Sequence, residues 1–323
     1  MSGSVRRSRD VPMLVKRARE GDPRAVARLI TLVESGDETV PAIAAELAPY
    51  TGRARIIGLT GSPGVGKSTT TSELVRALRA RGHRVGVLAV DPSSPFSGGA
   101  ILGDRIRMQD HATDPDVYIR SMSNRGHLGG LAAATPQAVR VLEGAGCEYV
   151  LIETVGVGQA EVEIASLADT TLVLLAPGMG DSIQAVKAGI LEIADVFVVN
   201  KADRDGADAT YHDIQNMISL GERAPGEWRP QVVRAIAARG EGIDDIVAAI
   251  DKHHRWMAER GELRRRRLAR AAAEVEAIAL GTLRARMGSL RDGTVLETLA
   301  QRVAAGELDP YTAAGEVLDQ LNR

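Results

Sequence analysis

The sequence predicts an α/β fold built on a doubly wound, mostly parallel sheet, with helical segments before and after it. Short apolar runs rich in β-branched residues do not alternate with polar ones, which is typical of strands covered on both faces. Helical patterns lie between several of these runs, and a glycine-rich loop follows the first. The runs cover residues 55–60, 85–90, 149–152, 171–175 and 196–199.

The first 50 residues are predicted to form a helical extension. Asp22 followed by Pro23 is a typical helix start, because the carboxylate caps free N–H groups and proline suits the first turn. Apolar residues over 26–33 then recur at helical spacing, and Gly36 ends the helix. The pattern indicates short helices packed on a larger domain.

The rest of the chain divides into a domain with alternating strands and helices and a helical C-terminal region. Helices are expected between the strands over 69–81 and 182–192, and beyond them over 243–260, 263–287 and from 309 onward. The expected domains are therefore 1–50, 51–260 and 261–323.

Composition excludes several classes of protein. The net charge of −2 disfavours a protein that mainly coats nucleic acid, and no apolar run reaches the roughly 18 residues of a membrane span. One cysteine, Cys147, allows no intrachain disulfide, which favours a reducing, cytoplasmic setting. The run Arg264–Arg267 has no aromatic neighbours for base stacking, so we expect a solvated face or an acidic partner.

The strongest motif follows the first predicted strand and fits the phosphate-binding P-loop, G-x-x-x-x-G-K-[ST]. Its glycines let backbone N–H groups hold phosphate oxygens at a helix start, Lys67 is expected at the β- and γ-phosphates, and Ser68 at Mg²⁺. The strand–loop–helix context makes a chance match improbable. The predicted binding residues are Gly61, Ser62, Pro63, Gly64, Val65, Gly66, Lys67, Ser68 and Thr69.

A second motif, Asn200-Lys201-Ala202-Asp203, follows the strand at 196–199 and indicates guanine. The carboxylate of Asp203 can accept from guanine N1–H and the 2-amino group, a donor pair that adenine lacks. Lys201 is expected over the base, and Asn200 between base and loop. An ordinary charged turn is the alternative, but the position after a P-loop disfavours it.

A third segment, Glu153-Thr154-Val155-Gly156, follows the strand at 149–152. Glu153 is predicted to hold Mg²⁺ through a water molecule, and the Gly156 N–H to meet the γ-phosphate. The next residue is Val157, where Ras-like GTPases place a water-orienting glutamine. We therefore expect the intrinsic hydrolysis of GTP to be slow, with the water-orienting group supplied from elsewhere. A plain turn at the strand end is the alternative.

Two aspartates and a lysine complete the candidate site. Asp91 ends the strand at 85–90 and Asp104 closes a Gly-, Pro- and Ser-rich loop, so both are candidate ligands for Mg²⁺. A helix cap or turn is the alternative for Asp91, and a solvated charge for Asp104. Lys187 stands out in a chain whose basic residues are nearly all arginine, although a solvated helix lysine is its plainer interpretation.

The loop GSPGVGKST, the segment DPSSPFSGGAILGDR, the strand end ETVGVGQ and NKAD occur in this order and resemble the MeaB family. These are GTPase chaperones of adenosylcobalamin-dependent methylmalonyl-CoA mutase, within the metallochaperone-type P-loop GTPases. The resemblance covers nearly the whole chain. It implies a homodimer joined through a C-terminal helical arm and a sheet of P-loop NTPase type.

The resemblance also implies residue roles. GTP or GDP would bind at the P-loop, and Mg²⁺ would be handled by Ser68, Asp91, Asp104 and Glu153. The loop that contains Lys187 resembles a third switch that responds to the mutase. The family's Ser-Ala turn is here Ala235-Ile236-Ala237-Ala238, so only backbone contacts from Ala237 and Ala238 to the base are expected.

The motifs predict Mg²⁺-dependent GTP hydrolysis, and the resemblance implies that this hydrolysis gates cofactor transfer to the mutase and guards the mutase against inactivation. The rival is a kinase of an amino-acid transport protein, the older ArgK-type assignment, for which the sequence nominates no phospho-acceptor site. A nickel or zinc chaperone lacks a Cys/His cluster. A scaffold with a purely structural nucleotide is disfavoured by Lys67, Ser68 and Glu153.

Overall fold

The structure is a computed structural model of the chain. It describes residues 10–92, 110–111, 113–124, 134–154, 160–178, 191–221, 224–291 and 294–321. The chain divides into two compact units, Met1–Arg270 and Ala271–Arg323. Among the helices within the described ranges, none is both long and apolar enough to cross a membrane.

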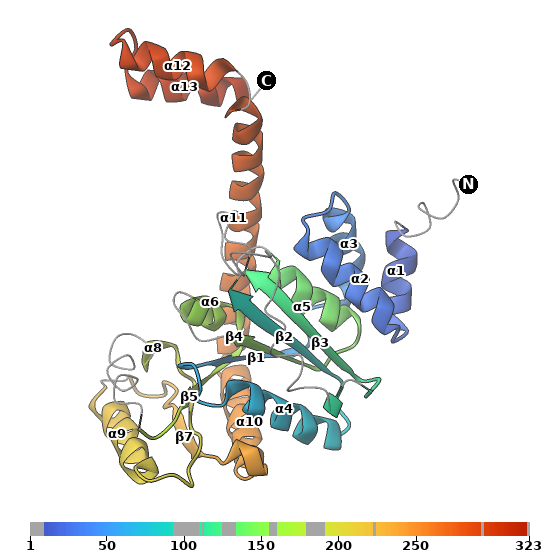
Figure 1. Cartoon of the computed structure of the whole chain (residues 1–323), viewed down its shortest axis with the longest axis vertical. Helices are drawn as coiled ribbons and strands as arrows, with labels where there is room; N and C mark the ends of the chain where they lie inside the picture. The colour runs from blue at the N-terminus through green and yellow to red at the C-terminus, as the bar shows by residue number, and fades with distance from the viewer. Residues whose placement is uncertain are drawn as a thin grey trace. The chain divides into compact units, whose positions relative to one another are not determined.

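The first unit is built around a seven-stranded parallel sheet in the order β3-β2-β4-β1-β5-β6-β7 (Figure 1). Because the strands are parallel, all their carboxyl ends lie at one edge of the sheet, where a ligand of such a fold binds. The strands are β1 (Arg55–Thr60), β2 (Val85–Pro92), β3 (Val117–Asn124), β4 (Tyr149–Thr154), β5 (Thr170–Leu175), β6 (Val196–Val199) and β7 (Gln231–Arg234).

The five strands predicted from apolar runs are all present, which confirms the doubly wound α/β fold. The prediction missed β3 and β7, which are the two outermost strands of the sheet. An outer strand is covered less completely and need not be a continuous apolar run. The sequence of β3, VYIRSMSN, accordingly mixes polar and apolar residues, and β7 is only four residues long.

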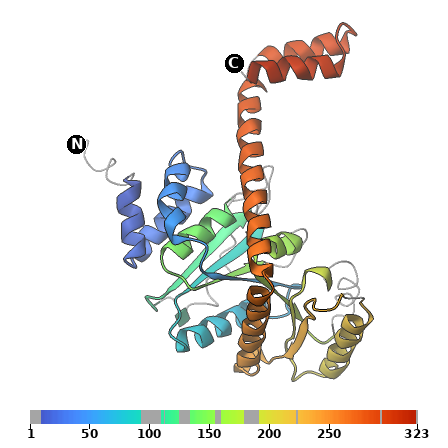
Figure 2. The same cartoon turned by 180° about the vertical axis from the view of Figure 1, so that it is seen from behind.

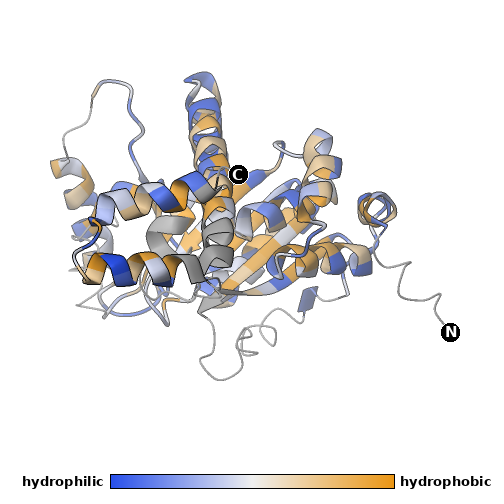
Figure 3. Ribbon diagram, turned by 90° about the horizontal axis from the view of Figure 1, so that it is seen from above, coloured by the Kyte–Doolittle hydropathy of each residue, from blue (hydrophilic) through white to orange (hydrophobic). Residues whose placement is uncertain are grey.

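Helices cover both faces of the sheet, whose strands form the apolar centre in Figure 3. On one face α4 and α10 pack against the central strands, and on the other α5, α6 and the N-terminal helices do so (Figures 1 and 2). A smaller cluster joins α9 to β5 and β6. The bounds are α4 (Lys67–Ala80), α5 (Thr135–Gly144), α6 (Ala160–Leu167), α8 (Leu191–Ile193), α9 (Ala207–Leu220), η6 (Ala237–Arg239) and α10 (Ile243–Glu259).

The N-terminal extension is helical, as predicted, and shares a core with α5. Asp22 caps α2, where its carboxylate accepts from the N–H groups of Arg24 and Ala25 at 2.9 and 3.4 Å. The predicted apolar stripe of this helix is buried against the sheet domain. The elements are α1 (Val11–Arg19), α2 (Pro23–Glu34), α3 (Val40–Leu47) and η2 (Ala48–Tyr50).

The C-terminal region is also helical. It contains α11 (Glu262–Arg291), α12 (Thr294–Ala304) and α13 (Pro310–Leu321). Within the second unit, Leu299 of α12 packs with Ala313 and Val317 of α13 in a small core. The sequence predicted α11 and α13 but not α12.

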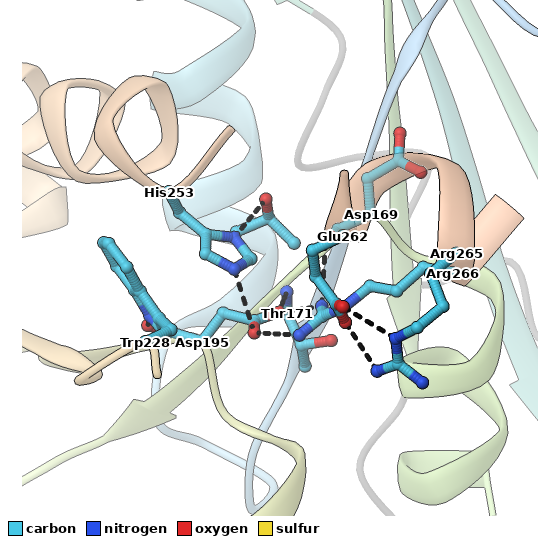
Figure 4. A network of polar contacts seen from close by, with 9 residues as sticks. Asp169, Thr171, Asp195, Trp228, His253, Glu262, Arg265 and Arg266 are labelled. Carbon is cyan, nitrogen blue, oxygen red and sulfur yellow. Dashed lines mark hydrogen bonds and ion pairs between the residues drawn. The ribbon is translucent and has the colours of Figure 1, made fainter. Parts of the chain in front are cut away.

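The start of α11 carries a charge cluster that corrects the expectation of a solvated face for Arg266 and Arg267, whose acidic partners lie within the chain itself (Figure 4). Arg264 and Arg265 are exposed, as a solvated face requires. Arg266 donates to both carboxylate oxygens of Asp195 at 3.0 Å each. Arg267 donates to Asp169 at 2.8 Å, and Arg270 donates to the same carboxylate at 3.3 Å. The two aspartates are buried just before β6 and β5, so these arginines fix the first turns of α11, up to Arg270, to the amino-terminal edge of the sheet.

His253 of α10 belongs to the same cluster and is fully buried. Its Nε2 lies 3.2 Å from Asp195, and its Nδ1 lies 2.9 Å from the hydroxyl of Thr170. Burial lowers the pKa of His253 to about 4, although the Asp195 carboxylate opposes this shift. The imidazole is therefore neutral at pH 7, and it fills the interior without adding a charge.

Candidate nucleotide-binding site

The P-loop lies between β1 and α4, as its motif predicted. The Gly61 φ is 139°, and a Cβ there would lie 2.3 Å from the Leu174 carbonyl of β5, so only glycine fits. The buried ammonium of Lys67 donates to the carbonyls of Gly61 and Ser62 at 2.6 and 3.1 Å. Lys67 therefore lies along the inside of its own loop, where the β- and γ-phosphates of a P-loop nucleotide are held.

Glu153 and Ser68 meet at the start of α4. Glu153 is the fifth residue of β4 and pairs in register with Leu59 of β1, which places it beside the P-loop. The Ser68 hydroxyl donates to the Glu153 carboxylate, and both side chains are buried. A hydroxyl and a carboxylate are hard oxygen ligands of the kind that Mg²⁺ prefers, so this pair fits a magnesium ion held next to the phosphates.

Asn200 connects the P-loop to the turn after β7. Its Nδ2 donates to the Val65 carbonyl at 2.8 Å, and its Oδ1 accepts from the Ala237 N–H at 3.0 Å. The side chain also lies so close to Gly66 that a Cβ there would be 2.3 Å from Nδ2. One buried amide thus holds together three segments that are far apart in the sequence.

Lys201 and Asp203 of the NKAD motif lie at the same edge of the sheet. Lys201 has a φ of 57°, which is uncommon for a residue with a side chain, and its ammonium donates to the Gly64 carbonyl at 2.6 Å. Asp203 is exposed, and one of its carboxylate oxygens lies 3.4 Å from the Arg239 guanidinium. Arg239 was not predicted, since an arginine gives no signal in an Arg-rich chain.

The structure therefore brings the P-loop, Glu153 and the NKAD motif to one edge of the sheet. The Ala237 N–H is used by Asn200, while Ala238 lies exposed beside it, and their contacts with a base stay predictions. Asp91 is the second-to-last residue of β2 at this edge, but only its backbone is described. Asp104, Gly156 and Lys187 lie outside the described residues, as do residues 182–190 of the helix predicted over 182–192.

Comparisons with known proteins agree with this geometry. Residues 26–291 match the model of the family described as "Methylmalonyl Co-A mutase-associated GTPase MeaB". A protein of Pyrococcus abyssi (strain GE5 / Orsay) that is named as a GTPase is 46% identical over 95% of this chain and 96% of its own length. The GTPase ArgK of Escherichia coli (strain K12) is 39% identical over 73% of each chain.

Two further matches have more specific names. A mouse protein named "Methylmalonic aciduria type A homolog, mitochondrial" is 41% identical over 65% of this chain and 52% of its own length. A crystal structure described as that of a LAO/AO transport system kinase is 27% identical, with a TM-score of 0.69, and covers 97% of this chain and 98% of its own.

Proposed function

Because the chain belongs to the MeaB family of GTPases, we propose that it hydrolyses GTP in order to gate adenosylcobalamin delivery to methylmalonyl-CoA mutase and to protect that enzyme. The family description supports the proposal, since it associates the GTPase with this mutase. The name of the mouse relative, which refers to methylmalonic aciduria, supports the same client.

The observation that carries the guanine assignment is the Asn200 bridge. It holds the P-loop against the turn after β7, so that the phosphate-binding and base-binding segments are fixed relative to each other. Asp203 follows three residues later at the same edge and is accessible for a base. Its carboxylate pairs with the two donors of guanine and would be left unpaired against adenine.

We assign Mg²⁺ to the Ser68 and Glu153 oxygens, with Asp91 and Asp104 as the further acidic groups of the proposed site. When bound, the ion neutralises charge that develops on the β- and γ-phosphates. Lys67 adds its positive charge at the same phosphates, where a water-excluded loop makes it effective.

Two more residues have proposed roles in hydrolysis. The Gly156 N–H is assigned to the γ-phosphate, and Lys187 to a loop that responds to the mutase. Because Val157 replaces the water-orienting glutamine of Ras-like GTPases, the protein alone should hydrolyse GTP slowly. The partner would then accelerate the reaction by completing the site.

We also propose that the protein is a cytoplasmic homodimer joined through residues 261–323, with 1–50 and 51–260 as its other domains. Large apolar side chains of α11 support this interface, since Leu268, Val275 and Ile278 are each more than half exposed at 60%, 68% and 56%. Exposed apolar groups that recur along one helix are typical of an interface with another chain.

The second candidate is a kinase acting on a transport protein, which the name of the structurally similar transport system kinase favours. The base-binding edge opposes it, because a carboxylate that pairs with guanine does not suit ATP. The two candidates therefore differ in the nucleotide that they consume and in the fate of the γ-phosphate.

The deciding experiment measures phosphate release from GTP and from ATP, with and without an adenosylcobalamin-dependent methylmalonyl-CoA mutase. We expect slow release from GTP, faster release with the mutase, and none from ATP. Lys67→Ala serves as the inactive control and should lose tight GTP binding, because the phosphates lose their cation.

Two other outcomes would contradict parts of the proposal. Comparable turnover of ATP would refute the guanine assignment and favour the kinase. GTP turnover that does not respond to the mutase would leave the GTPase standing and refute the client.

A further inference from the structure

Two buried hydroxyl groups beside the nucleotide site have no hydrogen-bond partner among the described residues. Thr60 is the last residue of β1 and Thr154 the last residue of β4, and both are fully buried. In the ranges that the structure describes, neither Oγ1 has a hydrogen-bond partner. Buried polar groups nearly always have one, supplied by protein or by ordered water, so this pair requires an explanation.

The strand register places the two hydroxyls side by side. Leu59 pairs with Glu153, so Thr60 and Thr154 are the next residues on two adjacent parallel strands. Successive side chains of a strand point to opposite faces, and Glu153 points to Ser68 on the α4 face. Both threonines therefore face the other side of the sheet.

A neighbouring glycine confirms which helix covers that side. Gly58 lies two residues before Thr60, on the same face, and a Cβ there would lie 2.5 Å from Ile164 of α6. The hydroxyls are thus at the α6 side of the strand ends, with the sheet between them and the Ser68–Glu153 pair.

Thr60 and Thr154 are flanked in the sheet by apolar residues. Across the sheet, Val90 of β2 pairs with Thr154, and Val173 of β5 pairs with Thr60. One row therefore reads Val, Thr, Thr, Val, and all four residues are buried. Valine has nearly the shape of threonine and would suit an apolar row better, because it buries no polar group. The hydroxyls therefore serve something other than packing.

We propose that an ordered water molecule bridges the Thr60 and Thr154 hydroxyls, and that these threonines are positioning residues for GTP hydrolysis. A buried water typically makes about three hydrogen bonds to polar groups that would otherwise be unsatisfied, and two such groups are adjacent here. The bridge ties the end of β1, which leads into the P-loop at Gly61, to the end of β4, which carries Glu153. It thereby fixes the phosphate-binding loop relative to the carboxylate assigned to Mg²⁺.

The test compares Thr60→Val and Thr154→Val, singly and together, with Thr60→Ser and Thr154→Ser, which keep the hydroxyl. Measurements are the GTP hydrolysis rate under single turnover, the affinity for GDP, and the thermal unfolding midpoint. A matched control is Thr210→Val, because Thr210 is a buried threonine of α9 whose hydroxyl donates to the carbonyl of Gly206, the N-cap residue of the same helix, at 3.0 Å.

We expect the double valine variant to unfold at the wild-type temperature or above it, because replacing both polar groups of a bridge by apolar groups of the same shape is nearly neutral or stabilising. All the valine variants should bind GDP within about twofold of wild type, since shape is kept. Their hydrolysis rate should fall at least about tenfold, because small displacements of catalytic groups are costly. The serine variants should retain most of the rate, and a high-resolution crystal structure should show the water.

The opposite results would overturn the proposal. Wild-type hydrolysis in the double valine variant would show that the hydroxyls position nothing. A joint loss of stability, GDP affinity and rate that serine does not rescue would show a merely structural role. The inference rests on the GTPase activity and not on the mutase, and the GDP measurement separates its failure from a failure of the nucleotide site.

Discussion

Replacing Arg266 with alanine should be far more damaging than the same change at its neighbour Arg265. The two residues are adjacent on α11 but differ in what surrounds their guanidinium groups (Figure 4). Arg265 has a side chain that is 75% exposed and pairs with Glu262 on its own helix. Arg266 reaches into the unit and pairs with Asp195, whose side chain is only 7% exposed.

The expected loss follows from these contacts. Arg266→Ala removes two charge-assisted hydrogen bonds of 3.0 Å to the Asp195 carboxylate and one of 3.0 Å to the Asp169 carbonyl. Among the described residues, the Asp195 carboxylate then keeps the Thr171 N–H, at 2.8 Å, and the neutral His253. Breaking a buried ion pair costs about 3–5 kcal/mol because a charge stays buried, whereas an exposed pair contributes less than about 1 kcal/mol.

Urea unfolding of the full chain, followed by circular dichroism at pH 7, measures both variants. We expect Arg266→Ala to lower the free energy of unfolding by about 3–5 kcal/mol, and Arg265→Ala by less than about 1 kcal/mol. Adding Asp195→Asn to Arg266→Ala should recover part of the loss, since it removes the uncompensated charge. Equal effects at the two arginines, or no recovery in the double variant, would refute the burial argument.

Three other predictions concern single residues. Gly66→Ala should weaken GTP binding in a titration much more than Gly82→Ala does. Both glycines have positive φ, but only at Gly66 does a Cβ meet another side chain, that of Asn200 at 2.3 Å. Asp203→Asn should reduce the preference for GTP over XTP in competition binding, and an unchanged ratio would contradict the base assignment. His253→Gln should flatten the loss of stability on acidification from pH 6.5 to 4. The folded pKa of about 4 lies below the ordinary 6.5, so the unfolded chain takes up the proton first and wild type loses about 3 kcal/mol over that interval. The free energy of unfolding is measured for both proteins at several pH values. Plots of this free energy against pH that run parallel for wild type and His253→Gln would contradict the prediction.

The fold was largely predictable because central strands of a parallel sheet must be apolar on both faces. That requirement made β1, β2, β4, β5 and β6 visible as continuous runs. The outer strands lacked the signal, since fewer of their side chains are enclosed. The helix start at Asp22 was visible because its cap and proline lie next to each other in the sequence.

The candidate site was predictable for a similar reason. P-loop and NKAD chemistry depends on short spacings within single segments, so the motifs could be recognised before the structure joined them through Asn200. The role of the arginines in α11 was not predictable. Their acidic partners lie 71 to 101 residues away, and no local pattern links Arg266 to Asp195 or Arg270 to Asp169.

The half-buried arginines at the start of α11 also determine where the chain can be truncated. A break after residue 260, the boundary that the sequence suggested, would remove Arg266, Arg267 and Arg270 and leave Asp169 and Asp195 without their cations. A break after Arg270 keeps every one of these pairs and coincides with the end of the first compact unit. A minimal nucleotide-binding fragment therefore has to carry the first turns of a helix whose remainder belongs to the other unit.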